Sequence, residues 1–261
     1  MIPNVCKRFL KFWVPSGLLE AYRLSRGQSF RRRLKWSEGY PQLAKARVEE
    51  MFPGVESLEV KIPFVAVSGG DECVLPTREL AVLAGICMCR KPQHVFEIGT
   101  YQGSSTTAIA LNTPESTEVY TLDLDPSTRD THKHGLGVGG ILPFEVGAQY
   151  RVSSVKSKIH QLYGNSLTYN YQPYLGKMDM VLVDADHTYE FVRRDTETAF
   201  QLLAPGGIVL WDDYVWNERH PECAGVTRCL NELGRKRKVY QIDGTRLAIY
   251  CDGGGETRCR G

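Results

Sequence analysis

The chain has 261 residues, enough for one α/β domain with a buried core and an appendage. Its composition, 42% hydrophobic and 24% charged, is that of an ordinary globular protein. The net charge of +2 is unevenly distributed: residues 1–36 contain nine of the 32 Lys and Arg residues and one of the 30 acidic residues, so the rest of the chain has a net charge of −6. The longest apolar run, Leu80 to Cys89, is too short to span a bilayer.

The eight cysteines show no spacing typical of a metal site. None belongs to a Cys-x-x-Cys pair, and no zinc-type histidine spacing accompanies them. Cys87 and Cys89 lie in an apolar stretch, where a cysteine with a free thiol packs as a small hydrophobe. We therefore expect a reduced, cytoplasmic protein, with a bridge between Cys251 and Cys259 as the alternative.

The first 36 residues are basic and amphipathic. Charged residues interrupt their apolar stretch, which is unlike a secretory signal. Bases interleaved with aromatic and aliphatic residues favour peripheral contact with an anionic membrane face, here the inner face, or with a second copy of the chain in a homo-oligomer. Binding to RNA phosphates and simple packing on the domain are the weaker alternatives. We divide the chain into an extension (1–40), a domain (41–251) and a tail (252–261).

From about residue 75 onward, helices and strands alternate. Short β-rich runs predict seven strands, at residues 94–98, 119–122, 159–163, 178–183, 208–211, 239–242 and 246–250. Helical spacing of apolar residues predicts four helices, the first capped by Thr77, at residues 77–89, 104–111, 189–203 and 226–233. Asp243-Gly244 indicates a hairpin between the last two strands. The glycine-rich insert 127–150 is typical of a lid, a binding loop or a disordered segment.

Strands that alternate with helices form a parallel sheet covered on both faces, and the final hairpin adds one antiparallel strand. The sequence therefore predicts a doubly wound, Rossmann-like α/β domain. In such a sheet, ligands bind at the carboxyl ends of the strands. The polar residues at those ends are Glu97, Asp123, Asn165, Asp184, Asp212 and Asp213.

The sharpest motif is Glu97-Ile98-Gly99-Thr100-Tyr101-Gln102-Gly103. Gly99 and Gly103 lack a Cβ, so the backbone can turn tightly and approach a ligand. The spacing differs from the Gly-x-Gly-x-x-Gly of dinucleotide sites, and an acid before Gly99 suits an ammonium or hydroxyl group better than a pyrophosphate. Asp123, at the end of the next strand, can accept both hydroxyls of a ribose. The simpler alternative is an ordinary strand-to-helix turn.

Two further motifs follow the fourth and fifth predicted strands: Val183-Asp184-Ala185-Asp186-His187-Thr188-Tyr189-Glu190, and Pro205 to Tyr214. With the glycine-rich turn, they make residues 75–251 resemble class I S-adenosylmethionine-dependent methyltransferases. The closest resemblance is to a bacterial O-methyltransferase family similar to catechol-type and sugar O-methyltransferases. It implies a seven-stranded sheet with an antiparallel last strand, and S-adenosylmethionine as the cofactor.

The resemblance also implies which residues hold the cofactor. Asp123 would bind the ribose, and Asn165 with Ser166 would border the adenine, where many relatives carry Asp. Glu97 and the turn residues Gly99, Thr100 and Gly103 would line the methionine moiety. Asp184 would complete the site.

The second group of candidates is acidic. Asp184, Asp212 and Asp213 follow adjacent strands, and three carboxylates in one crevice repel one another unless a cation or protons intervene. A hard divalent ion such as Mg²⁺ or Ca²⁺ fits this donor set, and in metal-dependent relatives the matching residues bind such an ion. The ion would orient the acceptor and lower the pKa of its hydroxyl. The alternative is that these residues only cap turns and close strands.

Methyl transfer to oxygen needs a proton acceptor near the nucleophile. Asp186 is our first candidate for this base, by resemblance to sugar O-methyltransferases, and His187 is the second because it titrates near neutral pH. The alternative for Asp186 is that it caps a helix beginning at His187. We expect an O-methyltransferase acting on a small molecule or glycan. A methyltransferase acting on RNA or protein has only the basic N-terminus in its favour, and the acidic cluster argues against a non-catalytic cofactor-binding protein.

Overall fold

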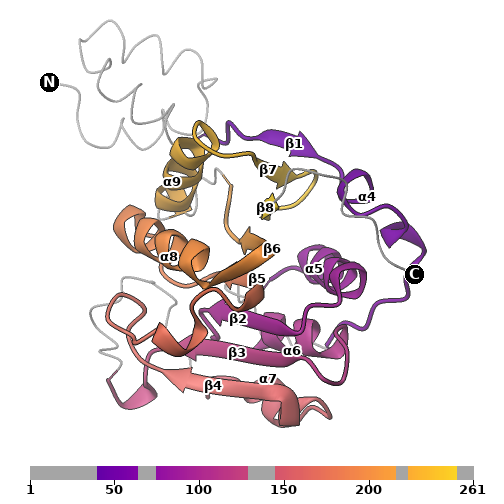
Figure 1. The fold of residues 1–261 in the computed structure, drawn as a ribbon, viewed down its shortest axis with the longest axis vertical. Coiled ribbons are helices and arrows are strands. Elements are labelled where there is room, and N and C mark those ends of the chain that lie inside the picture. Colours follow the sequence, from indigo (N-terminus) through magenta and orange to yellow (C-terminus); the bar gives the residue numbers. More distant parts are fainter. Residues whose placement is uncertain (1–39, 64–74, 129–144, 216–222, 252–261) are drawn as a thin grey trace, which may run out of the picture. The chain divides into compact units, whose positions relative to one another are not determined.

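The structure is a computed structural model that describes residues 40–63, 75–128, 145–215 and 223–251. From Pro41 onward these residues form one α/β unit around an eight-stranded sheet, whose strand order is β1-β7-β8-β6-β5-β2-β3-β4 (Figure 1). The strands are β1 (Ala44–Ala46), β2 (His94–Ile98), β3 (Glu118–Asp123), β4 (Ile159–Tyr163), β5 (Met178–Val183), β6 (Leu203–Trp211), β7 (Val239–Ile242) and β8 (Ala248–Cys251). Strand β8 runs antiparallel to β6 and β7, and the other neighbouring pairs are parallel.

All seven predicted strands are present, including the antiparallel one. The eighth, β1, is a three-residue edge strand that pairs with β7, and its Ala-Lys-Ala sequence has no β-rich character. Strand β6 begins at Leu203, five residues before the predicted start, because it continues through Pro205-Gly206-Gly207. Its pairing with β5 shifts register between Met178 and Met180, which accommodates these residues.

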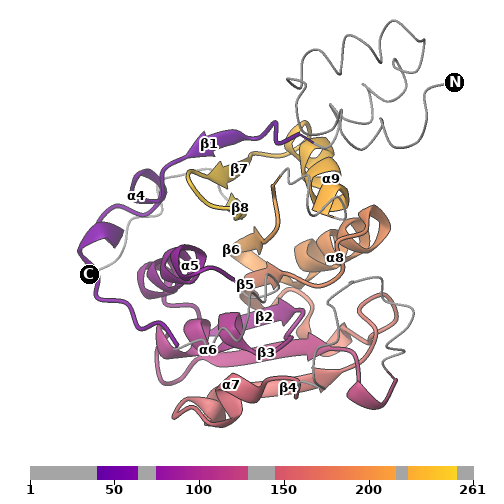
Figure 2. The ribbon, with the colours of Figure 1, turned by 180° about the vertical axis from the view of Figure 1, so that it is seen from behind.

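Helices cover both faces of the sheet (Figures 1 and 2). The helices are α4 (Val48–Met51), α5 (Thr77–Arg90), α6 (Ser104–Leu111), α7 (Ala148–Arg151), α8 (Tyr189–Leu202) and α9 (Ala224–Gly234). Alternate strand residues divide the core between the two faces, as the two-residue repeat of a strand requires. Val95 and Leu210 pack in one buried cluster with α5 and α6, whereas Phe96 and Trp211 pack in the other with α8 and α9. The four predicted helices are therefore α5, α6, α8 and α9.

Two local expectations need correction. Thr77 does not cap α5: Pro76 occupies the N-cap position, and Thr77 is the first helical residue. Helix α8 begins at Tyr189, with Thr188 at its N-cap, so no helix begins at His187. The described end of the insert forms α7; its residues 129–144, the N-terminal extension and the tail 252–261 lie outside the described residues.

The cysteines also differ from expectation. Cys89 is disulfide-bonded, so the prediction of a free thiol there is wrong. Among the described cysteines, Cys87, Cys223, Cys229 and Cys251 form no disulfide, which removes the proposed bridge between Cys251 and Cys259. No helix in the described part of the chain is long and apolar enough to cross a membrane.

Candidate functional site

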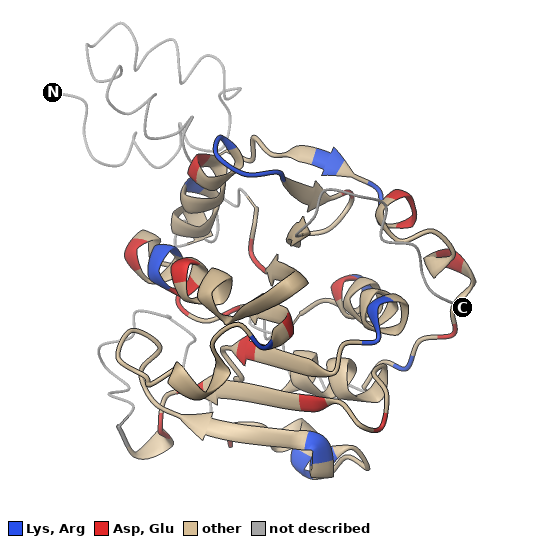
Figure 3. Cartoon of the chain, viewed as in Figure 1, with Lys and Arg blue, Asp and Glu red and all other residues tan. Residues whose placement is uncertain are grey.

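The candidate site lies where the central parallel strands end. Backbone hydrogen bonds continue past the strand ends: Gly99 N donates to Leu122 O at 2.8 Å, Asp184 N to Ile98 O at 2.8 Å, and Asp212 N to Val183 O at 3.2 Å. These bonds hold the polar residues after β2, β5 and β6 at one edge of the sheet. Acidic residues occur at several strand ends, whereas the basic run Arg235 to Lys238 lies between α9 and β7 (Figure 3).

The glycine-rich turn after β2 depends on Gly99 for a packing reason. Gly99 has φ +104°, and a Cβ placed there would lie 1.9 Å from the carbonyl oxygen of Asp184. The missing side chain therefore permits contact between the ends of β2 and β5. Gly103, at the N-cap of α6, has φ +83°, and a Cβ there would lie 2.8 Å from the ring of Tyr150.

Asp123 ties this turn to the end of β3. Its Oδ2 accepts hydrogen bonds from Tyr101 N at 2.8 Å and Thr100 N at 3.3 Å, and its Oδ1 accepts one from Leu124 N at 2.7 Å. The carboxylate thus stands directly beside the turn, as the sequence predicted for the ribose-binding acid.

Glu97 lies beneath the turn and is fully buried. Its Oε1 accepts a hydrogen bond from Ser105 Oγ at 2.5 Å, and its Oε2 accepts one from Thr121 Oγ1 at 2.6 Å and another from Thr106. Burial raises the pKa of Glu97 to about 7, although the three hydroxyl donors oppose the shift. The carboxyl group joins β2, β3 and the start of α6, so its observed partners are structural.

The described end of the insert packs on the same turn. Gly147 N donates to Tyr101 O at 2.8 Å, and Gln149 N donates to Gln102 O at 3.0 Å. Below them, Tyr150 donates to Gln161 Oε1 at 2.7 Å, and Gln161 Nε2 donates to Thr100 Oγ1 at 3.1 Å. These contacts were not predicted from local patterns, because they connect residues up to 61 positions apart.

Asn165 and Ser166 follow the end of β4, which neighbours the end of β3. Gly164 N donates to Asp123 O at 2.9 Å, which holds the end of β4 against the end of β3. Asn165 Oδ1 accepts a hydrogen bond from Leu167 N at 2.9 Å and so shapes the loop that follows β4. Asp195 of α8 is 1% exposed, and burial raises the pKa of its carboxyl group to about 6.

The structure brings the three predicted carboxylates together. Ligand oxygens of Asp184, Asp212 and Asp213 all lie within 4.8 Å of one another. The pKa of Asp184 is raised well above its ordinary value because its carboxyl group is desolvated and faces Asp212 and Asp213. Burial, with a further contribution from the charge of Asp213, raises the pKa of Asp212 to about 7. Ionisation of all three carboxyl groups together is therefore unfavourable.

Sequence reasoning missed the cation in this cluster. Arg246 Nη2 donates to Asp212 Oδ2 at 2.9 Å, and Arg246 Nη1 lies 3.3 Å from Asp213 Oδ1. The predicted hairpin contained a usable signal. Because β8 is antiparallel to β6, with Ala248 paired to Trp211, residues just before β8 must lie at the carboxyl end of β6.

The two candidate bases differ in their contacts. Asp186 Oδ1 accepts a hydrogen bond from Thr188 N at 2.7 Å, and Asp186 lines the same small cavity as Asp184 and Asp212. His187 lines this cavity too, and its Nε2 lies 2.8 Å from Asp213 Oδ2. Burial lowers the pKa of His187, but the hydrogen bond and negative charge of Asp213 outweigh it, so the pKa is raised.

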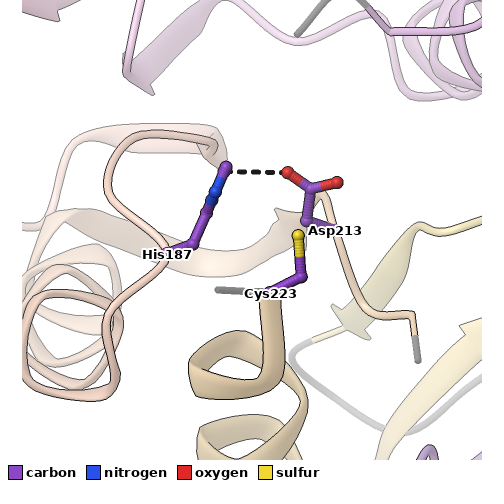
Figure 4. A group of neighbouring side chains, drawn as sticks. All are labelled: His187, Asp213 and Cys223. Atoms are coloured by element: carbon purple, nitrogen blue, oxygen red, sulfur yellow. Dashed lines mark ion pairs between the residues drawn. The ribbon is translucent and has the colours of Figure 1, made fainter. Parts of the chain in front are cut away.

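A third side chain joins His187 and Asp213. Cys223 is the N-cap residue of α9 and is 5% exposed, and its sulfur belongs to a group in which the ligand atoms of all three residues lie within 4.8 Å of one another (Figure 4). Asp213 has φ +59°, a left-handed backbone conformation that costs energy for a non-glycine residue. Cys223 had no recognisable sequence signal, because its neighbours here are distant in the chain.

A family model described as a methyltransferase domain matches residues 96–214. This match begins in β2 and ends after β6, so it includes the glycine-rich turn and the three carboxylates. The caffeoyl-CoA O-methyltransferase of Stellaria longipes is 29% identical over 126 residues, which are 48% of this chain and 48% of that protein. The alignment thus spans about half the length of this relative.

Solved structures share the fold. The O-methyltransferase TomG from Streptomyces achromogenes, solved in complex with SAM, matches with a TM-score of 0.52 and 21% identity, covering 76% of this chain and 94% of that one. An SAH-bound methyltransferase from Podospora anserina matches with a TM-score of 0.56 and 16% identity, covering 92% and 97%. At these identities, the likeness shows a common arrangement of helices and strands.

Proposed function

Because this chain carries a class I S-adenosylmethionine-dependent methyltransferase domain, we propose that it methylates a hydroxyl oxygen of a small molecule or glycan. The observation that carries the proposal is the position of Asp123. Its carboxylate is hydrogen-bonded to the glycine-rich turn, and the end of β4 is bonded to its backbone. An acid in this place suits a ribose beside a tight backbone turn.

The residues present fit the cofactor. Asp123 presents a carboxylate, an acceptor for ribose hydroxyls, beside the glycine-rich turn, and Asn165 with Ser166 borders the adenine in this proposal. The turn from Gly99 to Gly103, with Glu97 beneath it and Asp184 beside it, lines the methionine moiety. When bound, S-adenosylmethionine supplies an electrophilic methyl group, and its transfer to the acceptor oxygen breaks the methyl–sulfur bond and releases S-adenosylhomocysteine.

We propose that Asp186 is the general base that accepts the proton of the acceptor hydroxyl. Asp186 lines the small cavity between Asp184 and Asp212, and one of its oxygens is held by Thr188 N. His187 Nε2 lies 2.8 Å from Asp213 Oδ2, so this ring nitrogen already faces a carboxylate and is less well placed for the acceptor hydroxyl. His187 instead fixes the carboxylate of Asp213.

The acidic cluster also fits a hard divalent ion. Within the described residues, Asp212 Oδ1 is buried without a hydrogen-bond partner, and it lies close to the carboxylates of Asp184 and Asp213. We therefore propose that these three residues hold Mg²⁺ or Ca²⁺ beside Arg246, which already contributes one positive charge. Such an ion would supply the positive charge that lowers the pKa of an acceptor hydroxyl.

Methyl transfer from labelled S-adenosylmethionine to fractionated small molecules and glycans tests the proposal. The full-length protein should label a fraction that Asp186→Asn labels much more slowly, because general-base catalysis typically contributes about 10²–10⁴-fold. Glu190→Asn is a matched control, since Glu190 is exposed on the first turn of α8 and pairs with Arg193. Label found only in RNA or protein would contradict the proposed acceptor class.

A chelator included in the same assay separates the metal from the base. Loss of labelling with the chelator and its return with Mg²⁺ support metal assistance. Full labelling with the chelator would contradict it and leave the acid and base residues acting alone.

A further inference from the structure

We propose that His187, Asp213 and Cys223 form a binding site for a transition-metal ion of the Zn²⁺ type. The three side chains come from different segments: the loop after β5, the end of β6 and the N-cap of α9. Their nitrogen, oxygen and sulfur ligand atoms lie within 4.8 Å of one another, and Figure 4 shows the ion pair between His187 and Asp213 with the side chain of Cys223 next to it. The inference goes beyond methyl transfer and does not depend on it.

The donor types select the ion. Mg²⁺ and Ca²⁺ take oxygen ligands, whereas an imidazole, a thiolate and a carboxylate together are typical of Zn²⁺ and related ions. Cys223 therefore distinguishes this set from the oxygen-only set of Asp184, Asp212 and Asp213. The two sets share Asp213, so they are neighbouring sites with different chemistry.

The distance between His187 and Asp213 suits a tetrahedral ion after a small adjustment. His187 Nε2 lies 2.8 Å from Asp213 Oδ2. Two ligand atoms about 2.1 Å from a tetrahedral ion lie roughly 3.4 Å apart, so the pair must open by about half an ångström. Three protein ligands leave one coordination position for water or an acceptor oxygen, as in catalytic rather than structural zinc sites.

The surrounding backbone holds these donors in place. A Cβ on Gly225 would lie 2.2 Å from His187 O and 2.6 Å from Tyr189 N, so the first turn of α9 packs directly on the loop that carries His187. Glycine at position 225 thus allows Cys223, two residues earlier, to reach His187. The left-handed backbone of Asp213 is a second constraint, since strained conformations persist where the surrounding structure imposes them.

Arg246 supports the carboxylate ligand. Its Nη1 lies 3.3 Å from Asp213 Oδ1, while Oδ2 of the same carboxylate faces His187. Residues that bond to a metal ligand without contacting the metal orient that ligand and increase the affinity for the metal. The competing interpretation is a buried His–Asp ion pair with Cys223 packed beside it as a small hydrophobe.

Cobalt spectroscopy separates these interpretations. The untagged, full-length protein is stripped of metal with a chelator and titrated with Co²⁺, an optical probe for zinc sites. We expect a thiolate-to-cobalt charge-transfer band that Zn²⁺ abolishes by displacement. Cys223→Ser should lose the band, and Cys229→Ser, at a buried cysteine on the same helix, should keep it. His187→Gln should weaken Co²⁺ binding by at least about tenfold, because even changes around a ligand cost about 10–100-fold.

Three outcomes would overturn the site. These are no Co²⁺ binding, Co²⁺ binding without a thiolate band, and a thiolate band that survives in Cys223→Ser. Asp184→Asn should leave the band in place, which separates this set from the oxygen-only cluster. If Cys223→Ser fails to fold, zinc-edge X-ray absorption of the unaltered protein decides the question: one sulfur ligand with nitrogen and oxygen supports the site, and an oxygen-only shell contradicts it.

Discussion

Arg246 and Asp212 form an ion pair at the heart of the acidic cluster, with Nη2 2.9 Å from Oδ2. The side chain of Asp212 is 2% exposed and that of Arg246 is 25% exposed, so the pair is largely removed from water. The other terminal nitrogen of Arg246, Nη1, lies 3.3 Å from Asp213 Oδ1. From the sequence, we expected a metal ion or protons to offset the charge of the three carboxylates, and Arg246 supplies one positive charge there. It reduces the repulsion among the carboxylates without removing it, because the pKa values of Asp184 and Asp212 are still raised.

Replacing this cation should destabilise the protein. Arg246→Gln leaves buried carboxylates without their partner, and we expect the free energy of unfolding to fall by about 3 kcal/mol. Denaturant unfolding measures the change. Arg194→Gln is the control, because Arg194 is 58% exposed and its ion pair with Glu190 should contribute less than about 1 kcal/mol. Added Mg²⁺ should restore part of the loss in Arg246→Gln only; equal losses in the two variants would contradict the role of Arg246.

Gly99 should be intolerant of any side chain. In Gly99→Ala the Cβ would overlap the carbonyl group of Asp184, in a backbone conformation with φ +104°. The left-handed conformation alone costs about 1–2 kcal/mol, and the overlap should add about 1–3 kcal/mol. Gly176→Ala measures the cost of the left-handed conformation alone, because Gly176 has φ +67° and no atom lies within 4 Å of its Cβ position. Equal unfolding free energies for the two variants would contradict the packing argument.

The buried Glu97 should make stability depend on pH. Its pKa is raised to about 7 in the folded protein, above the ordinary value of 4.5, so the folded state binds the proton more tightly than the unfolded state does. This contribution is fully present below pH 4.5 and is lost as the pH rises through about 7. It amounts to about 3 kcal/mol.

Urea unfolding between pH 4.5 and 8 measures that contribution. In Glu97→Gln, which carries no titrating group at this position, the decline in unfolding free energy with rising pH should be smaller than in the unaltered protein. Glu56→Gln, at an exposed position, should leave the decline unchanged. Parallel pH curves for the unaltered protein and Glu97→Gln would show that Glu97 does not titrate in this range.

The sequence predicted the sheet well because its strands have a strong local signal. Runs such as His94–Ile98 and Met178–Val183 are buried between helices and therefore β-rich throughout. The edge strand Ala44–Ala46 has no such composition, since it forms only through pairing with β7. The disulfide at Cys89 was missed because an apolar helix gives a cysteine no local mark of its partner.

The candidate site was predictable only in part. The rule that parallel strands present their carboxyl ends at one edge placed Asp123, Asp184 and Asp212 together correctly. Arg246 and Cys223 were missed because they reach the site through an antiparallel hairpin and a helix N-terminus, which depend on long-range packing. The packing constraint at Gly99 was not predicted for the same reason: its nearest neighbour is the backbone of another strand end.

Calorimetry with S-adenosylhomocysteine tests the central claim most directly. Asp123→Ala should weaken binding by about 1–3 kcal/mol, because it removes charge-assisted hydrogen bonds from the proposed ribose site. Asp125→Ala is the matched control: Asp125 lies two residues further on, is partly exposed, and accepts hydrogen bonds from Ser127 within its own turn. We expect weaker binding in Asp123→Ala and unchanged affinity in Asp125→Ala. Unchanged affinity in a folded Asp123→Ala variant, or no binding by the unaltered protein, would contradict it.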